Sequence, residues 1–186
     1  MKGGYAGKLL RVDLNSGTIN TELLDPKIAF NFLGGRGYGA WILYRELKRG
    51  TDPLGPANRL IFMTGPLTGT PFPGSGRTAV VFKSPLTGTI ADSSMGGFFG
   101  AWLKRAGFDG LIVQGRSKKP VYIEIDDDKV TLHDATELWG KSTLETIEEL
   151  LGRYSQFSIA TIGPAGENLA RMACVVTGNR EGRMGV

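Results

Sequence analysis

The sequence predicts an α+β fold in which a unit of β-hairpin, helix and strands is internally duplicated, with pseudo-two-fold symmetry. The first observation behind this prediction is that a hairpin pattern, a helical pattern and two strand patterns occur twice in the same order. The second is a Gly-Pro pair in each copy, at 65–66 and 163–164, and the third is a Met-Gly pair, at 95–96 and 184–185. A period this long is not that of a solenoid, and chance similarity among short β motifs is the alternative explanation.

The first copy opens with a predicted β-hairpin and two helices. Strands at 8–14 and 18–24 flank a short turn that contains a glycine, which is typical of a hairpin. A helix is then expected to run to Phe32, because Asp25 is a good N-cap residue and a proline follows it. After a glycine-rich stretch, residues 41–50 are predicted to form a second helix that ends at its final glycine.

Three strands and a further helix complete the first copy. Apolar runs predict buried strands at 60–64, 77–83 and 110–115. Between the last two strands, the glycine pair at 96–97 leads into an amphipathic helix whose polar side carries a lysine and an arginine. Backbone N–H groups at such a helix start can hold an anion, or the glycines can simply form a tight turn.

The second copy repeats this order. A hairpin is predicted over 121–134, with its turn at three consecutive aspartates. A helix is predicted to begin after Ser142, because this residue and Glu145 have the spacing of a capping box. Two strands are expected to follow, at 157–163 and 171–178.

Composition and charge argue against several classes of protein. The chain has 186 residues, of which 41% are hydrophobic, enough for one compact domain. The net charge of +4 is small, whereas a nucleic-acid-binding protein is expected to carry a dense cluster of basic residues on one face. No apolar run reaches the length of about 18 residues that predicts a membrane span, and the first residues lack the apolar core of a signal peptide. The single cysteine can form no internal disulfide, and a cytoplasmic protein is expected.

Common catalytic and nucleotide-binding motifs do not account for the chain. The glycine cluster at 34–39 lacks the G-x-G-x-x-G spacing and follows a helical pattern rather than a strand. The only histidine, His133, ends a hairpin strand with no ligand cluster at metal-binding spacing, which indicates a surface or structural role. Cys174 stands among apolar residues of a predicted strand and is expected to be buried. No catalytic acid, base or nucleophile is therefore assigned.

Three glycine-rich stretches are candidates for contact with a phosphate. Residues 73–77 and 178–185 place arginines among glycines, and residues 93–100 place glycines at a helix start. The planar fork of an arginine matches phosphate oxygens, and successive backbone N–H groups form an anion-binding nest. The alternatives are loops with solvated arginines and an ordinary helix start.

Several long strings resemble the aldehyde:ferredoxin oxidoreductase family of tungstopterin enzymes. They include "GPLTGTPFPGSGR", "GGFFGAWLKRAGFDGLIVQG" and "IGPAGENLARMA". The resemblance covers essentially the whole chain and only the N-terminal domain of the family. It implies that residues 1–186 are a fragment of a longer enzyme. In the family this domain is a duplicated base for a tungsten bis-molybdopterin cofactor, and the absent C-terminal part carries a 4Fe-4S cluster.

The resemblance also implies which residues contact the cofactor. Arg77 matches a pterin-contacting arginine, Gly96 matches a family glycine, and Arg183 and Met184 match the second contact loop. Ser94 stands where relatives can have asparagine, which puts a side-chain contact in doubt but leaves a backbone contact possible. The backbone carbonyls of Ser94 and Met184 would be ligands of a magnesium ion that bridges the two pterin phosphates.

The function implied by the resemblance belongs to the full-length protein. That protein would oxidise a small aldehyde to a carboxylic acid and pass electrons through its cluster to ferredoxin, whereas the fragment alone is expected to be inactive. A homodimer is a further possibility. The alternatives are a family member acting on an aromatic acid or thioester, a stand-alone module that binds a phosphorylated ligand, and a purely structural domain.

Overall fold

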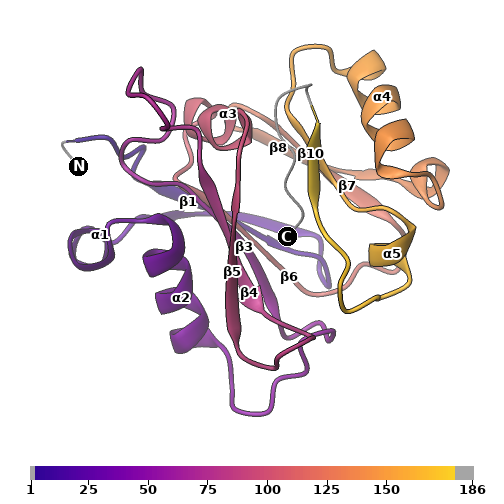
Figure 1. Cartoon of the computed structure of the whole chain (residues 1–186), viewed down its shortest axis with the longest axis horizontal. Helices are drawn as coiled ribbons and strands as arrows, with labels where there is room; N and C mark the ends of the chain where they lie inside the picture. The colour runs from indigo at the N-terminus through magenta and orange to yellow at the C-terminus, as the bar shows by residue number, and fades with distance from the viewer. Residues whose placement is uncertain (1–2, 179–186) are drawn as a thin grey trace.

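The structure, a computed structural model, describes residues 3–178. Within these residues six strands form one sheet in the order β2-β1-β6-β3-β4-β5 (Figure 1). β6 runs parallel to β1 and antiparallel to β3, and the remaining neighbours are antiparallel. The strands are β1 (Lys8–Asp13), β2 (Thr18–Leu23), β3 (Arg59–Met63), β4 (Thr78–Lys83), β5 (Ile90–Met95) and β6 (Gly110–Gln114).

Two helices cover one face of this sheet (Figure 1). α1 (Pro26–Phe32) begins after Asp25, whose carboxylate accepts the backbone N–H of Lys27 at 2.8 Å, so the predicted N-cap is confirmed. α2 (Gly35–Glu46) packs on β3 and β4. The buried residues of this core include Leu9, Ala29, Tyr38, Ile42, Leu43, Ile61, Met63 and Val81.

The opposite face of the sheet packs against α3 (Phe99–Arg105) and a separate hairpin. That hairpin consists of β7 (Val121–Asp126) and β8 (Lys129–Asp134) and turns at the aspartates, as predicted. Phe99 of α3 packs on Phe62 of the sheet, with ring centroids 5.4 Å apart. The buried residues here are Leu10, Val12, Phe62, Val80, Met95, Leu103, Phe108 and Leu111.

The remaining elements form a smaller third core. They are the 3-10 turn η1 (Thr136–Leu138), α4 (Thr143–Arg153), β9 (Ile159–Thr161), α5 (Pro164–Glu167) and β10 (Val176–Gly178). The predicted capping box opens α4, because the Ser142 side chain accepts the backbone N–H of Glu145 and the Glu145 carboxylate accepts that of Ser142. β9 and β10 form an antiparallel pair. Within residues 3–178 this pair and the β7–β8 pair are two separate sheets.

An ion-pair network ties α2 to the large sheet. The Glu46 carboxylate lies 2.7 Å from Arg11 and 2.9 Å from Arg59, and Arg11 also contacts Glu22 at 2.5 Å. Burial raises the pKa of Glu46, but the hydrogen bonds and charges of the two guanidinium groups outweigh burial and leave this pKa below its ordinary value. The network therefore stabilises the ionised form of Glu46.

Two predicted helix and strand boundaries are wrong. The second helix occupies Gly35–Glu46 rather than 41–50, so it starts inside the glycine cluster. Glycine is needed there because a Cβ on Gly39 would lie 2.6 Å from Val81 of β4. The last strand begins at Val176, and Cys174 precedes it with an exposed side chain, so the prediction of a buried thiol is also wrong.

The strand β5 was not predicted from the sequence. Its residues, "IADSSM", alternate between exposed and partly buried positions and only Met95 is fully buried, so the apolar signal is weak. The predicted α+β class is confirmed, whereas the internal duplication stays a prediction. Among the described helices, none combines the length and the apolar character needed to cross a membrane.

Candidate functional site

Glycine-rich segments from different parts of the chain meet at the start of α3. A Cβ on Gly76 would lie 2.9 Å from the carbonyl oxygen of Gly97, and one on Gly69 would lie 3.3 Å from the Ala101 backbone. Gly97 has a φ of 76° and Gly69 a φ of 79°, values that favour glycine. The loop between β3 and β4 therefore lies directly against the segment that joins β5 to α3.

Arg77 stands at the edge of this junction, immediately before β4. Its side chain is exposed, and its Nη1 lies 3.4 Å from the carbonyl oxygen of Ser94, to which it donates a long hydrogen bond. β4 and β5 pair so that Ala79 faces Ser94 and Thr78 faces Met95. The structure thus brings Arg77, just before β4, close to Ser94 on the outer strand β5.

Ser94 and Gly96 lie on either side of the buried residue Met95. Met95 is fully buried, whereas Ser94 is exposed and Gly96 is partly exposed. Among the described residues, a Cβ on Gly96 would meet no atom within 4 Å, so its backbone is open on this side to the rest of residues 3–178. Arg183 and Met184, the other predicted contact residues, lie outside the described residues.

A buried ion pair supports the loop that leads to Arg77. Asp109 is 1% exposed, and its carboxylate accepts the backbone N–H groups of Ala6 at 3.0 Å and Gly7 at 2.6 Å. Lys104 of α3 lies 3.3 Å from Asp109 and donates to the Gly65 carbonyl at 2.6 Å. Burial lowers the pKa of Lys104, and the Asp109 charge partly opposes this shift. The pair joins the N-terminal segment, α3 and the first residues of the glycine-rich loop.

The loop itself is held by its own hydroxyl groups. The Thr68 hydroxyl accepts the backbone N–H of Gly65 at 3.0 Å and donates to the carbonyl of Arg77 at 3.2 Å. The Ser75 hydroxyl donates to the carbonyl of Thr70 at 2.7 Å. These bonds close the loop between its two ends, so Arg77 is displayed by a structured turn rather than by an extended segment.

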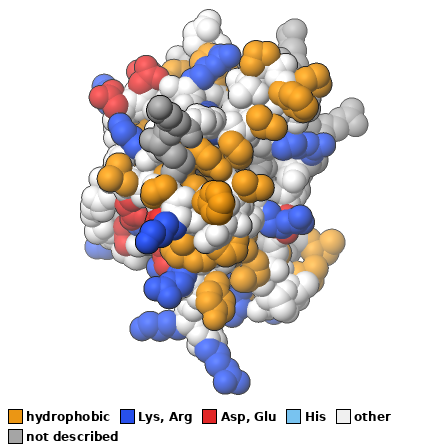
Figure 2. Space-filling model, turned by 90° about the vertical axis from the view of Figure 1, so that its left-hand side faces the viewer, with side chains coloured by type: hydrophobic (Ala, Val, Ile, Leu, Met, Phe, Trp, Pro, Cys, Tyr) orange, Lys and Arg blue, Asp and Glu red, His pale blue; other side chains and the backbone are white. Residues whose placement is uncertain are grey.

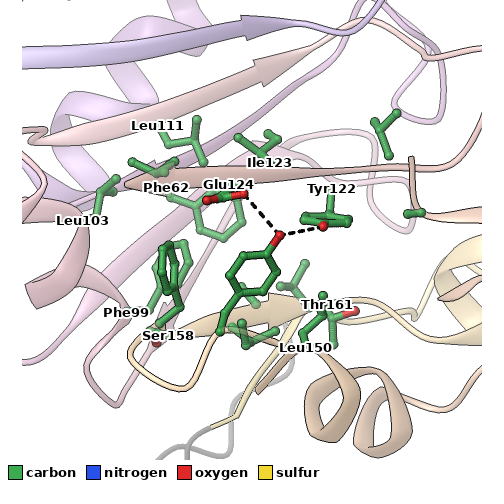
Figure 3. A pocket seen from close by; sticks show the side chains of 18 of the residues that line it. Phe62, Phe99, Leu103, Leu111, Tyr122, Ile123, Glu124, Leu150, Ser158 and Thr161 are labelled. Carbon is green, nitrogen blue, oxygen red and sulfur yellow. Dashed lines mark hydrogen bonds between the residues drawn. The ribbon is translucent and has the colours of Figure 1, made fainter. Parts of the chain in front are cut away.

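A second feature is an apolar cavity of about 660 Å³ between the large sheet and the small core. Phe62, Phe99 and Leu103 line one side, and residues of β7, α4 and β9 line the other (Figure 3). Arg77, Ser94 and Gly96 are not among the lining residues. The cavity is therefore a different place from the glycine-rich junction.

Polar groups at the cavity wall are largely paired with one another. The Tyr154 hydroxyl lies 2.9 Å from that of Tyr122 and 3.2 Å from a carboxylate oxygen of Glu124, the two bonds drawn in Figure 3. The hydrogen bond with Tyr122, together with burial and the Glu124 charge, raises the pKa of Tyr154. His133 stacks on Tyr122, and its Nε2 lies 2.6 Å from Glu124 but outside hydrogen-bond geometry. This packing agrees with the structural role predicted for His133.

Between residues 3 and 178 no group of three or more His, Cys, Asp and Glu side chains is placed to hold a metal ion.

A family model described as aldehyde ferredoxin oxidoreductase, N-terminal domain, matches residues 9–186. The chain belongs to this family. The resemblance inferred from the sequence is thereby confirmed.

Individual members of the aldehyde ferredoxin oxidoreductase family are similar over nearly the whole chain. The tungsten-containing aldehyde ferredoxin oxidoreductase of Pyrococcus horikoshii is 50% identical over 98% of this chain, and that of Pyrococcus furiosus is 46% identical over 98%. The chain spans 31% of the length of each of these relatives. The active site complex BamBC of benzoyl coenzyme A reductase, solved with 1,5 dienoyl-CoA, is 39% identical, with a TM-score of 0.93, over 98% of this chain and 28% of that one.

Sequence reasoning found the junction residues of this aldehyde ferredoxin oxidoreductase domain but missed what supports them. Arg77, Ser94 and Gly96 were proposed from family strings, and their closeness in space is a finding of the structure. Lys104 was assigned to the polar side of its helix, although its side chain is only 11% exposed. Its partner Asp109 lies between apolar Phe108 and a glycine, and no motif marks it.

Proposed function

We propose that the chain is the cofactor-binding N-terminal domain, residues 1–186, of a tungsten-pterin enzyme. The full-length protein oxidises aldehydes to carboxylic acids and passes the electrons to ferredoxin. The observation that carries this proposal is the identity of 46–50% over 98% of the chain to proteins named tungsten-containing aldehyde ferredoxin oxidoreductase. A 4Fe-4S cluster, the substrate pocket and the groups that move protons belong to the remainder of the protein.

The glycine-rich junction fits one pterin of a bis-molybdopterin cofactor. Arg77 presents an exposed guanidinium whose donors suit a phosphate or a polar heterocycle, and the open backbone at Gly96 permits close approach. The cofactor supplies the redox chemistry through its metal, and the residues of this chain bind and orient it. Ser94, through its backbone carbonyl, and Gly96 complete this wall.

Arg183 and Met184 form the second wall in this proposal. They come after β10 in the sequence, whereas Arg77 precedes β4 and Ser94 is the penultimate residue of β5. The backbone carbonyls of Ser94 and Met184 would be the ligands that this chain offers to a magnesium ion, which would offset the negative charge of the phosphates. The Arg77 guanidinium donates to the Ser94 carbonyl at 3.4 Å, so it would have to leave this oxygen before the oxygen could bind a cation.

Two such walls agree with the internal duplication that the sequence predicts. The hairpins β1–β2 and β7–β8 are each followed by helical segments and then by an antiparallel pair, β3–β4 and β9–β10. A Gly-Pro pair follows both β3 and β9. This repeated order is the arrangement expected for two related halves that each hold one pterin.

The surface of the domain supports docking of the remaining polypeptide. Phe30 and Leu33 at α1 are 85% and 64% exposed, and Phe72 in the loop before β4 is 62% exposed. Figure 2, which views the molecule from the side of α1 and this loop, shows apolar side chains gathered over the face with lysines and arginines around them. Large exposed apolar patches mark interaction sites. The enzyme is cytoplasmic in this proposal, and a homodimer is possible.

The second candidate function is another reaction within the same family. The similarity of 39% to the BamBC complex of benzoyl coenzyme A reductase favours an aromatic thioester as the alternative substrate class. A WOR-like subunit named aliphatic sulfonate oxidoreductase, from Pyrococcus furiosus, is 38% identical over 93% of the chain. Both values are below the 50% identity to the aldehyde enzyme, so aldehyde oxidation is preferred.

The proposal is tested by metal analysis of the full-length protein and two variants. We expect tungsten and iron in the wild type, and a tungsten content about tenfold lower in Arg77→Ala and in Arg183→Ala, because each loses a charge-assisted contact with the cofactor. The matched control is Arg49→Ala, an exposed arginine in the loop after α2. An unchanged tungsten content in both variants would favour the alternative that this domain is purely structural. Iron without tungsten or molybdenum in the wild type would reject the cofactor assignment.

The isolated chain is expected to be inactive. In this proposal it supplies only part of the cofactor site, since the relatives are about three times longer. Reduction of a viologen dye with an aldehyde by residues 1–186 alone would contradict this expectation. A reading frame that carries no cluster cysteines would favour a stand-alone module that binds a phosphorylated ligand.

A further inference from the structure

Thr68 lies in the glycine-rich loop between β3 and β4, and its hydroxyl and methyl groups contact different neighbours. The residue is 7% exposed. Its hydroxyl accepts the backbone N–H of Gly65 at 3.0 Å and donates to the carbonyl of Arg77 at 3.2 Å. Its methyl group lies against α3, where a Cβ on Gly100 would come within 3.1 Å of it. Because a β-branched side chain is stiff about its first torsion, the methyl contact fixes the hydroxyl toward the loop.

The Gly65 end of this loop is fixed by other segments of the chain. The Lys104 ammonium of α3 donates to the Gly65 carbonyl at 2.6 Å. A Cβ on Gly4 would overlap the carbonyl oxygen of Pro66, so the N-terminal segment packs directly on the Gly-Pro turn. Since Lys104 binds the carbonyl of Gly65 and Thr68 accepts its N–H, the backbone of Gly65 is fixed on both sides.

The Arg77 end of the loop lies just before the sheet begins. β4 pairs with β5 from Thr78 onward and with β3 from Ala79 onward, so both ladders start after Arg77. The Thr68 hydroxyl reaches the Arg77 carbonyl across nine residues of sequence. This one hydroxyl therefore joins the exposed arginine to the fixed Gly65 end.

We propose that Thr68 is a positioning residue that fixes Arg77 for its contact with the cofactor. This inference rests on the proposed function, in which Arg77 binds one pterin. Thr68 is buried and uncharged, so it acts through the backbone of Arg77 rather than by touching the ligand. Functional side chains need to be placed to within about 0.5 Å, and for a side chain as long as arginine this precision requires a fixed backbone.

Substitutions in the full-length protein test this proposal, with tungsten content per chain as the first measurement. Thr68→Val keeps the shape and removes the hydroxyl, and we expect its tungsten content to be about fivefold lower. Thr68→Ser keeps the hydroxyl and should stay within about twofold of the wild type. The matched control is Thr70→Val, expected to match the wild type, because the Thr70 hydroxyl donates to the Leu67 carbonyl at 2.8 Å within the same loop. Equal losses in Thr68→Val and in either Thr68→Ser or Thr70→Val would contradict the proposal.

The double variant Thr68→Val/Arg77→Ala distinguishes positioning from an independent role of Thr68. If Thr68 acts through Arg77, the double variant has the tungsten content of Arg77→Ala, about tenfold below the wild type. Independent losses would multiply to about fiftyfold and overturn the proposal. Wild-type tungsten in Thr68→Val beside a depleted Arg77→Ala would reject the positioning role and leave the proposed function intact. A wild-type protein without tungsten would reject both.

Hydrogen–deuterium exchange gives a readout that does not depend on the cofactor. The full-length protein is produced without tungsten or molybdenum, so that both forms are compared in the same unloaded state. The Gly65 amide loses its acceptor in Thr68→Val, and we expect peptides from residues 64–77 to exchange about two- to tenfold faster. Peptides from the inner strands β1 and β3 should stay protected over the same time. Unchanged exchange at 64–77, or lost protection in the inner strands as well, would refute a local role for the Thr68 hydroxyl.

Discussion

Asp109 stabilises the segments that surround the glycine-rich junction. It lies wholly inside the protein, accepts two backbone N–H groups and faces the Lys104 ammonium at 3.3 Å. Replacing a buried ion pair by apolar groups can be neutral, but removing one partner leaves the other charge buried without compensation. The pair therefore makes the position of Arg77 sensitive to a change about 30 residues away in sequence, in a segment that does not touch the cofactor in our proposal.

The first prediction concerns the substitution Asp109→Asn. We expect it to lower the free energy of unfolding by about 3–5 kcal/mol, because the Lys104 ammonium loses its counter-charge in a buried place. Urea denaturation followed by tryptophan fluorescence measures this loss. Glu148→Gln makes the same chemical change at an exposed position and is expected to alter stability by less than about 0.5 kcal/mol. Equal losses in the two variants would show that the buried pair has no special role.

The second prediction concerns Glu46 and acid stability. Its folded-state pKa is below the ordinary value, so its ionised form contributes stability that is present above the unfolded pKa of about 4.3 and is lost as the pH falls through the folded pKa. We expect Glu46→Gln to be less stable than the wild type by about 2 kcal/mol at pH 7. This difference should shrink as the pH falls below about 4. Urea midpoints measured between these pH values test it, and a difference independent of pH would contradict it.

At the scale of elements, local signals predicted most of the strands and helices, and tertiary contacts decided the others. Asp25 and the Ser142–Glu145 pair fixed helix starts because capping is a local hydrogen-bonding event. β5 was missed because its order comes from pairing with β4 rather than from its own apolar residues. α2 was placed too late because its glycines suggest a break, whereas Gly39 allows the helix to approach Val81.

The same limit applies to the candidate site. An arginine among glycines made residues 73–77 a candidate but is a weak signal by itself, and the resemblance of the surrounding string to a family is what implied a pterin contact for Arg77. Its contact with Ser94 depends on the β4–β5 register, and its support depends on Lys104 and Asp109, which come from another helix and the segment after it. No local pattern encodes contacts that the folded chain makes between distant segments.

The third prediction uses two helical glycines that should respond in opposite directions. A Cβ on Gly100 of α3 would clash with the Thr78 hydroxyl of β4, whereas a Cβ on Gly152 of α4 would meet no atom of residues 3–178 within 4 Å. We expect Gly100→Ala to destabilise the protein by about 1–3 kcal/mol through overpacking. Gly152→Ala should stabilise it by up to about 1 kcal/mol through helix propensity. Thermal unfolding of both variants measures these effects, and a stabilised Gly100→Ala would show that α3 is free to move away from β4.

At the scale of the whole molecule, the described chain consists of one complete sheet and one small core joined through apolar packing (Figure 1). The α3 helix connects these regions, because Phe99 and Leu103 line the cavity while the start of the helix forms the glycine-rich junction.

The central position of β6 also has a consequence for synthesis on the ribosome. Arg11 of β1 faces Ile112 of β6, a separation of 101 residues, so the N-terminal hairpin must wait until β6 is made before it joins β3. At about 5–20 residues per second this delay is about 5–20 s. We expect the hairpin of stalled nascent chains to be cut readily by protease until β6 has left the exit tunnel, and to resist afterwards. Resistance in shorter chains would mean that nascent β1 and β2 pair with another segment before β6 is made. If they do not, chaperones are expected to shield the unpaired hairpin until then.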